Sequence, residues 1–116
     1  MKDLTNESKV ELLSKVKSFL DITWSDTHTD NEVWGYIVSS IRRLDDIAGC
    51  ELDYLADEET DEDDVYLSMC FLGSDLLLNR CYYIREKALD DFEKNFRSEL
   101  VSLFQIGRVY DTEETS

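Results

Sequence analysis

The sequence predicts an all-α fold, a small bundle of three to four helices with a long C-terminal helix and an acidic loop. Proline is absent and only four of the 116 residues are glycine, so few positions interrupt a helix. Apolar residues recur every three to four positions, which is the period of an amphipathic helix. We expect one helical domain at residues 1–110 and a flexible acidic tail at residues 111–116.

The first two helices are expected where a capping pattern precedes an apolar stripe. Residues 8–11 read as a capping box in which Ser8 caps the helix, and the following stripe runs to Leu20. Residues 29–32 form a second box that begins with Thr29. The helix that follows has a natural end at Gly49, because glycine readily adopts the left-handed conformation found after helices.

A third stripe covers residues 63–105. A continuous helix of that length would extend roughly 65 Å at about 1.5 Å per residue, which is too long for a compact domain of this size. The alternatives are one long helix that leaves the domain, or two helices with a break near Gly73, where Ser74 or Asp75 could cap the second. We favour the break.

The charge of the chain restricts its functions. There are 27 acidic and 12 basic residues, giving a net charge of −15, so the chain lacks the cationic excess that holds nucleic acid by its phosphates. The longest unbroken apolar run, residues 69–72, is far too short for a membrane span. Residues 1–7 contain no apolar segment of the kind found in secretory signals, so we expect a reducing compartment. The three cysteines, Cys50, Cys70 and Cys81, are expected to be small buried hydrophobes.

Residues 51–64 form the acidic loop, in which nine of fourteen residues are Asp or Glu. Leu52, Tyr54 and Leu55 are expected to anchor its start in the core. The part from residue 57 onward must be solvated, because so many carboxylates are not buried without partners.

No pattern in the sequence indicates catalysis. His28 is the only histidine, and the phosphate-binding, dinucleotide-binding and nucleophile-elbow motifs are all absent. A metal site from His28, Asp26 and Asp30 can be drawn, but the two acids are better explained as loop and cap residues. We expect no enzymatic activity, no metal and no cofactor.

Interaction with other proteins is the remaining function class. Several aromatic residues lie off the apolar stripes, which is typical of protein interfaces. Basic residues cluster between positions 80 and 97, whereas acidic ones dominate 51–64. This segregation favours head-to-tail association of identical chains, with Arg80 and Arg85 among the bases that contact a neighbour's acids.

Two stretches of the sequence resemble the head–tail connector family of tailed phages, also called adaptor or head-completion proteins. The first is TDNEV at residues 29–33, continued by an apolar stripe that ends in AGC at 48–50. The second, and more specific, is DLLLNRCYYIR at residues 75–85 followed by ALDDFEKNF at 88–96. The similarity extends over roughly residues 8–106, most of it as helical pattern.

The resemblance implies a structural virion protein, made in the host cytoplasm, that binds the portal protein after DNA packaging. It would form a ring of about 12 copies that extends the DNA channel and receives a stopper or tail-completion protein. Docking on the portal would use residues 96–110, including Phe96, Leu100 and Phe104. DNA would pass through without specific binding, and a carboxylate-lined lumen would repel its phosphates. The acidic residues predicted to border that channel are Glu58, Glu59, Asp61 and Glu62.

Two other functions are compatible with the composition. A DNA mimic could occupy a nucleic-acid enzyme with its carboxylates, although a mimic needs them along an elongated face and here they are bunched in one loop. The third alternative is a helical adaptor that binds a partner helix, but no particular residue or motif indicates it.

Overall fold

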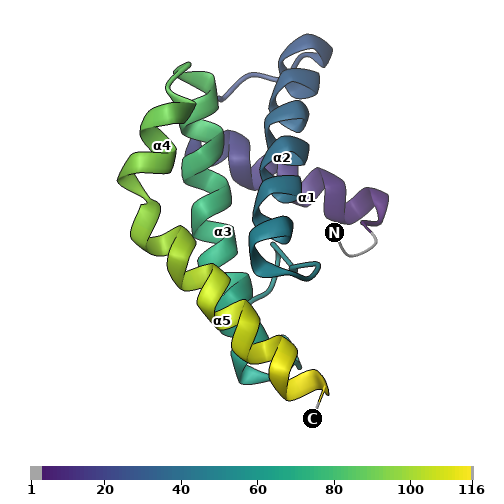
Figure 1. The fold of residues 1–116 in the computed structure, drawn as a ribbon. Coiled ribbons are helices and arrows are strands. Elements are labelled where there is room, and N and C mark those ends of the chain that lie inside the picture. The colour runs from purple at the N-terminus through teal and green to yellow at the C-terminus, as the bar shows by residue number, and fades with distance from the viewer. Residues whose placement is uncertain (1–3, 116) are drawn as a thin grey trace.

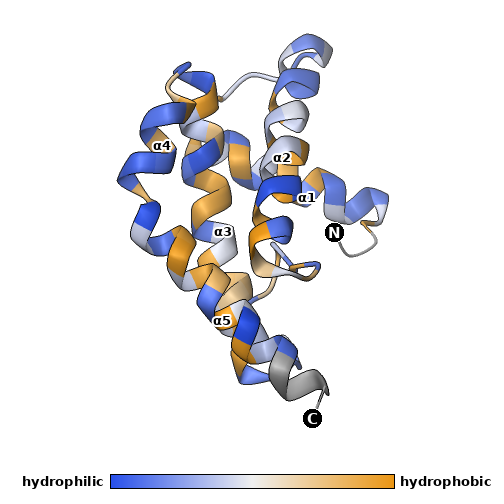
Figure 2. Cartoon of the chain, in the orientation of Figure 1, coloured by the Kyte–Doolittle hydropathy of each residue, from blue (hydrophilic) through white to orange (hydrophobic). Residues whose placement is uncertain are grey.

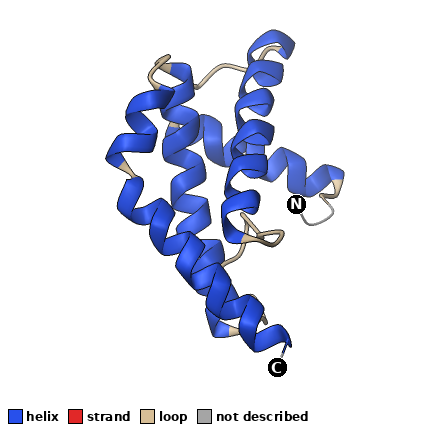
Figure 3. Cartoon of the chain, in the orientation of Figure 1, coloured by secondary structure: helices blue, strands red, loops and turns tan. Residues whose placement is uncertain are grey.

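The computed structural model describes residues 4–115, with residues 112–115 described as backbone only. The chain forms five helices in this range, and the described residues contain no strand (Figure 3). The helices are α1 (Asn6–Phe19), α2 (Thr27–Ala48), α3 (Asp64–Arg85), α4 (Leu89–Asn95) and α5 (Arg97–Thr115). The predicted all-α class is confirmed, whereas the helix count is five because the third predicted stripe is divided twice.

The caps of the first two helices lie three residues before the predicted ones. The hydroxyl of Thr5 accepts the backbone N–H of Ser8 at 3.1 Å, so Thr5 is the cap of α1. The carboxylate of Asp26 likewise caps α2, accepting the N–H of Thr29 at 2.8 Å and its hydroxyl at 2.9 Å. These hydrogen bonds hold the pKa of the Asp26 carboxyl below its usual range. Ser8 and Thr29, the predicted caps, instead donate their backbone N–H groups to a cap one turn earlier.

The predicted break near Gly73 is wrong, because α3 continues through it. A Cβ added at Gly73 would lie 2.7 Å from Cδ1 of Leu52, so a larger residue there would displace the Leu52 side chain from its present place against α3. The chain breaks instead at Lys87, where φ is 56°, and again at Phe96 between α4 and α5. The C-terminal helix α5 includes residues 111–115, predicted as a flexible tail, and Ser116 lies outside the described residues.

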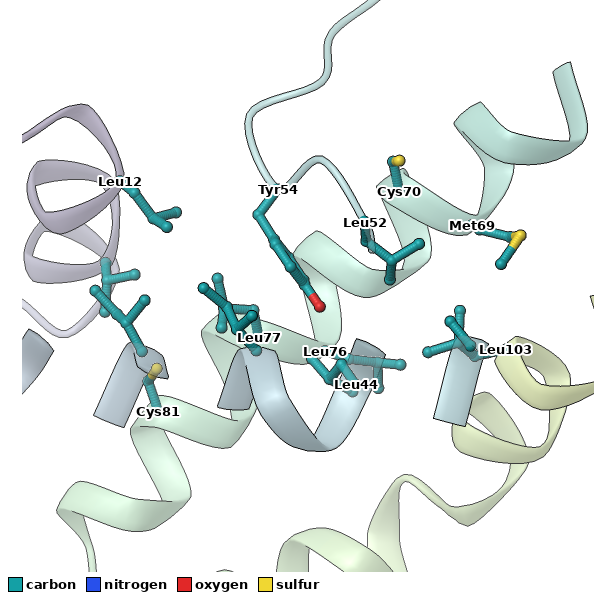
Figure 4. Close-up of a cluster of buried hydrophobic side chains, with 14 of the residues drawn as sticks. Leu12, Leu44, Leu52, Tyr54, Met69, Cys70, Leu76, Leu77, Cys81 and Leu103 are labelled. Atoms are coloured by element: carbon teal, nitrogen blue, oxygen red, sulfur yellow. The ribbon is translucent and has the colours of Figure 1, made fainter. Parts of the chain in front are cut away.

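Helix α3 is the centre of the bundle, and α2, α4 and α5 pack along it while α1 crosses behind α2 (Figure 1). Hydrophobic residues recur along α3 and α5, and hydrophilic residues cover much of α4 (Figure 2). The core combines side chains from all five helices, Phe92 of α4 among them, with two from the acidic loop, and the close-up shows part of it (Figure 4). Among its fully buried members are Leu12, Leu44, Leu52, Met69, Leu76, Leu77 and Leu103.

The end of α2 lies directly against α5. A Cβ added at Gly107 would overlap the backbone carbonyl of Ala48, so only glycine permits this approach. As predicted, Gly49 ends α2 in the left-handed conformation, with φ 76°. This contact holds α2 and α5 together and defines one end of the surface between them.

Candidate protein-interaction surface

A groove of about 510 Å³ lies on the surface between α2 and the α4–α5 segment. It brings together two of the predicted interaction residues, Leu100 and Phe104. Phe104 is 49% exposed and Val101 is 46% exposed, whereas Leu100 is buried beneath them. The lining residues are Arg43, Ile47, Glu93, Lys94, Arg97, Leu100, Val101 and Phe104. We call this surface the α2–α5 groove.

The rim of the α2–α5 groove is basic. Arg43 pairs with Glu93, with 3.1 Å between Nε and Oε1. Lys94 and Arg97 are exposed and form no ion pair within residues 4–111. Three bases and one acid give the lining a formal charge of +2, on a chain whose net charge is −15. The groove therefore offers an apolar floor and a positive rim to an acidic, partly apolar partner.

Arg80 was predicted to contact a partner, and the structure places it inside the bundle. Its side chain is buried, and Nη1 donates to the hydroxyls of Ser39 at 3.1 Å and Ser40 at 3.0 Å. Burial lowers the pKa of the Arg80 guanidinium, and its Nε has no hydrogen-bond partner within the described residues. Arg80 therefore joins α3 to α2.

Arg85 and Phe96, also predicted to contact a partner, hold helices in place within the chain. Nη1 of Arg85 donates to the carbonyl of Leu20 at 2.6 Å, which ties the end of α3 to the end of α1. Phe96 is half-buried and stacks on Phe92, with 5.0 Å between ring centroids. The ring of Tyr83 packs edge-on against that of Phe96, with 5.9 Å between the ring centroids. This aromatic cluster orients α4, and with it the Glu93 and Lys94 side of the groove.

The acidic loop has a buried beginning and an exposed end. Leu52 and Tyr54 are buried as predicted, while Leu55 is half-buried against the core. Asp57 forms a local turn with Thr60, whose hydroxyl accepts the Asp57 N–H at 2.9 Å. The four acids predicted to border a channel, Glu58, Glu59, Asp61 and Glu62, are all exposed.

Asp63, the last loop acid, caps α3 by accepting the N–H groups of Val65 and Tyr66. This contact joins the end of the exposed segment to α3, while the Asp57 turn gives its beginning a local structure. We call residues 57–63 the acidic segment. Its structural acids, Asp57 and Asp63, are thus distinct from the four predicted to act on DNA.

The perturbed ionisable groups of the interior are explained by packing. Burial raises the pKa of Tyr54, and the hydroxyl donates to Asp45 Oδ1 at 2.7 Å. Burial also raises the pKa of Tyr66. Burial raises the pKa of the Cys81 thiol to about 11, so it stays protonated near neutral pH and is a poor nucleophile.

A second hollow lies where the ends of α1 and α2 meet, and a structural ion pair occupies one side of it. Lys17 Nζ lies 2.7 Å from Asp30 Oδ1 and donates to the hydroxyl of Ser25 at 3.2 Å. His28 is exposed and lies 3.4 Å from Glu32. Within the described part of the chain, no three His, Cys, Asp or Glu side chains are placed to hold a metal ion. The same residues include no helix that is both long and apolar enough to cross a membrane.

No protein-family model, curated protein or solved structure matches this chain. A function must therefore be argued from the residues themselves. The prediction from sequence missed Arg43, Ile47 and Val101, three of the residues that line the groove. A usable signal existed on α5, because residues 97, 100, 101 and 104 have the spacing of one helix face.

Proposed function

We propose that this chain is a head–tail connector of a tailed phage, a structural protein that binds the portal and extends the DNA channel as a ring. The observation that carries the proposal is the presence of two surfaces of different chemistry on one small bundle. One is the α2–α5 groove, which is apolar with a positive rim. The other is the acidic segment, which is exposed, begins in a local turn and ends at the cap of α3. A ring subunit around DNA needs a surface for a protein neighbour and a surface that does not bind phosphate.

The acidic segment suits a channel border for an electrostatic reason. Glu58, Glu59 and Asp61 are exposed and carry like charge to the DNA backbone. Carboxylates near a phosphate repel it, and this repulsion allows the duplex to move along the channel without adhering. Because Asp57 shapes the segment into a turn and Asp63 joins its end to α3, these charged side chains are displayed at the surface.

The exposed side of α5 provides a surface for the portal. Val109 is 52% exposed, and it lies five residues from Phe104, which places it on a different helix face from the groove. Residues 96–110, the stretch that the resemblance assigns to portal docking, thus present two separate faces. In this proposal the face with Val109 contacts the portal, and the groove remains available to a neighbouring subunit.

Co-sedimentation with DNA-filled capsids that carry the portal of the same phage tests this function. We expect the wild-type chain to bind such capsids and Val109→Asp to reduce binding by about tenfold, because a buried unpaired carboxylate costs more than 1.4 kcal/mol. Phe19→Asp is a matched control on α1, where Phe19 is 46% exposed. Absence of binding by the wild-type chain, or inhibition of a nuclease by the purified monomer, would contradict the connector function.

A further inference from the structure

We propose that the α2–α5 groove binds helix α1 of a second copy of this chain. In this contact Val10 of the neighbour lies on the apolar floor, and its Glu7 and Glu11 pair with Lys94 and Arg97. The inference rests on the proposed function, because a ring requires each subunit to carry two different and complementary surfaces. It adds to that function the residues through which subunits meet.

Helix α1 has an exposed face with the required composition. Glu7, Val10, Glu11 and Ser14 follow the i, i+3, i+4, i+7 spacing that places side chains on one face, and all four are exposed. Val10 is 66% exposed, more than any other large hydrophobic residue in the described part of the chain. The face therefore presents one apolar side chain between two carboxylates, and we call it the α1 face.

The lysines adjacent to the α1 face are engaged within their own subunit. Lys9 Nζ lies 4.8 Å from the ring centroid of Trp34. Lys15 Nζ donates to the carbonyl of Tyr54 at 3.3 Å. Because these two cations bind the chain's own α2 and acidic loop, the charge that the α1 face offers to a partner is that of Glu7 and Glu11.

The groove complements this face in both charge and polarity. Lys94 and Arg97 have no ion-pair partner within residues 4–111, while Val101 and Phe104 expose apolar surface beside them. An amphipathic helix that lays its apolar stripe in a groove and its charges on the rim is a common mode of protein recognition. The acidic segment is a poorer occupant, because its seven residues include no apolar side chain to cover Phe104.

The two surfaces lie on different sides of the molecule. Figure 1 shows that α1 crosses behind α2 and that its N-terminal half extends away from α4 and α5. A subunit therefore cannot place its own α1 face in its own groove. In this proposal the contact is made between copies, and a contact between unlike surfaces repeats from subunit to subunit and forms a ring where the rotation closes.

Sedimentation equilibrium at low salt tests the contact by charge reversal. We expect the wild-type chain to self-associate with a Kd tighter than about 1 mM. Lys94→Glu with Arg97→Glu should weaken association by about tenfold or more, and Glu7→Lys with Glu11→Lys should do the same, because each converts two attractions into repulsions. Mixing the two reversed variants should restore association to within about threefold of wild type, since the intact groove of one variant then meets the intact α1 face of the other, and at the alternate contact the reversed charges face each other.

A matched control separates this contact from the general charge of the chain. Arg42→Glu with Lys87→Glu makes the same change in net charge at exposed positions outside the groove, and should leave association within about twofold of wild type. Circular dichroism verifies that every variant is folded. A monomeric wild-type chain, an unchanged Kd for the Lys94 and Arg97 variant, or a mixture that fails to associate would each overturn the proposal.

Capsid binding distinguishes this inference from the proposed function. If the chain associates through these charges but does not bind portal-bearing capsids, the connector function is wrong and the contact stands. If the chain binds capsids while the reversed variants associate as wild type does, the contact is wrong and the function stands.

Discussion

Residues 51–56 and residues 57–63 are consecutive parts of one acidic stretch, and only the first is held in the core. Leu52 is 1% exposed and Tyr54 is 3% exposed, whereas six of the seven residues from 57 to 63 are exposed. In the first part, Asp45 Oδ1 accepts the Leu52 N–H at 3.2 Å and the Tyr54 hydroxyl at 2.7 Å. In the second, the hydrogen bonds of Asp57 and Thr60 stay inside the segment. Apolar anchors, and not the density of charge, decide which part of such a stretch is ordered by the core.

The largest effect should come from removing the first anchor. Leu52→Ala should lower the free energy of unfolding by about 2–5 kcal/mol, because it leaves a cavity against α3 in a fully buried site. Urea unfolding followed by circular dichroism measures the change. A loss below about 1 kcal/mol would mean that the loop, and not the leucine, determines the packing there.

A double-mutant cycle with Gly73 makes this prediction specific to the contact. Gly73→Ala in the wild-type chain sets the new methyl group against Leu52, whereas in the Leu52→Ala chain the methyl group has room. We therefore expect Gly73→Ala to be more favourable in the Leu52→Ala chain by about 1 kcal/mol, because the helix preference for alanine is the same in both chains and only the contact with Leu52 differs. Additive effects would show that the two residues do not interact.

A smaller effect is expected from the second anchor. Tyr54→Phe should lower the free energy of unfolding by about 1–2 kcal/mol at neutral pH, because the half-buried Asp45 loses its hydroxyl donor while the ring still fills its site. Tyr82→Phe is a control, since Tyr82 is 45% exposed and should change stability little.

The pH dependence of Tyr54→Phe tests the cause of its raised pKa. Burial and the hydrogen bond to Asp45 disfavour the phenolate in the folded state, so the folded pKa lies above the unfolded one, near 10. The contribution of the Tyr54 hydroxyl to the free energy of unfolding is fully present below the unfolded pKa. It is lost as pH rises from the unfolded pKa towards the folded one, because only the unfolded state then releases the proton. The wild-type chain should lose stability above about pH 10, and Tyr54→Phe should lose it less steeply. Equal slopes would contradict this account.

Sequence periodicity predicted the parts of the fold that depend on local pattern. The all-α class, the end of α2 at Gly49 and the anchoring by Leu52 and Tyr54 follow from apolar spacing and residue type. The two helix caps were predicted one turn too late. Ser8 and Thr29 are residue types that cap helices as readily as the observed caps Thr5 and Asp26, so sequence alone does not choose between them.

The parts that depend on contacts between distant residues could not be predicted. Gly73 resembles a helix break in sequence, but it lies inside α3, where it faces Leu52 of a different segment. The break at Lys87 has no signal, because a lysine with positive φ is rare. Arg80 resembled a surface base because its partners Ser39 and Ser40 lie about 40 positions earlier in the chain. The α5 side of the groove could be predicted from the spacing of its residues along the helix. Arg43 and Ile47 could not, because they line the groove only once α2 packs beside α5.

The smallest effect on stability is expected in the second half of the stretch. Replacing Glu58, Glu59 and Asp61 by lysine should change the free energy of unfolding by no more than about 0.5 kcal/mol, because these side chains are exposed and take no part in the hydrogen bonds of the Asp57–Thr60 turn or of the α3 cap. Any increase in the free energy of unfolding should become smaller with added salt, since it would come from reduced repulsion between carboxylates in a chain of charge −15. Thermal unfolding at low and high salt measures both.

Because the fold is preserved, the same triple variant isolates the role of the charges on DNA. If the acidic segment borders the channel, lysines there should bind the duplex and slow its ejection from capsids, as each new cation attracts phosphate. Asp46, Asp75 and Asp91, which are exposed elsewhere, supply a matched triple change to lysine that should leave ejection unchanged. Identical ejection rates for the two variants would show that residues 58–61 do not border the channel. Residues 51–56 and 57–63 would then differ only in how they pack against the core.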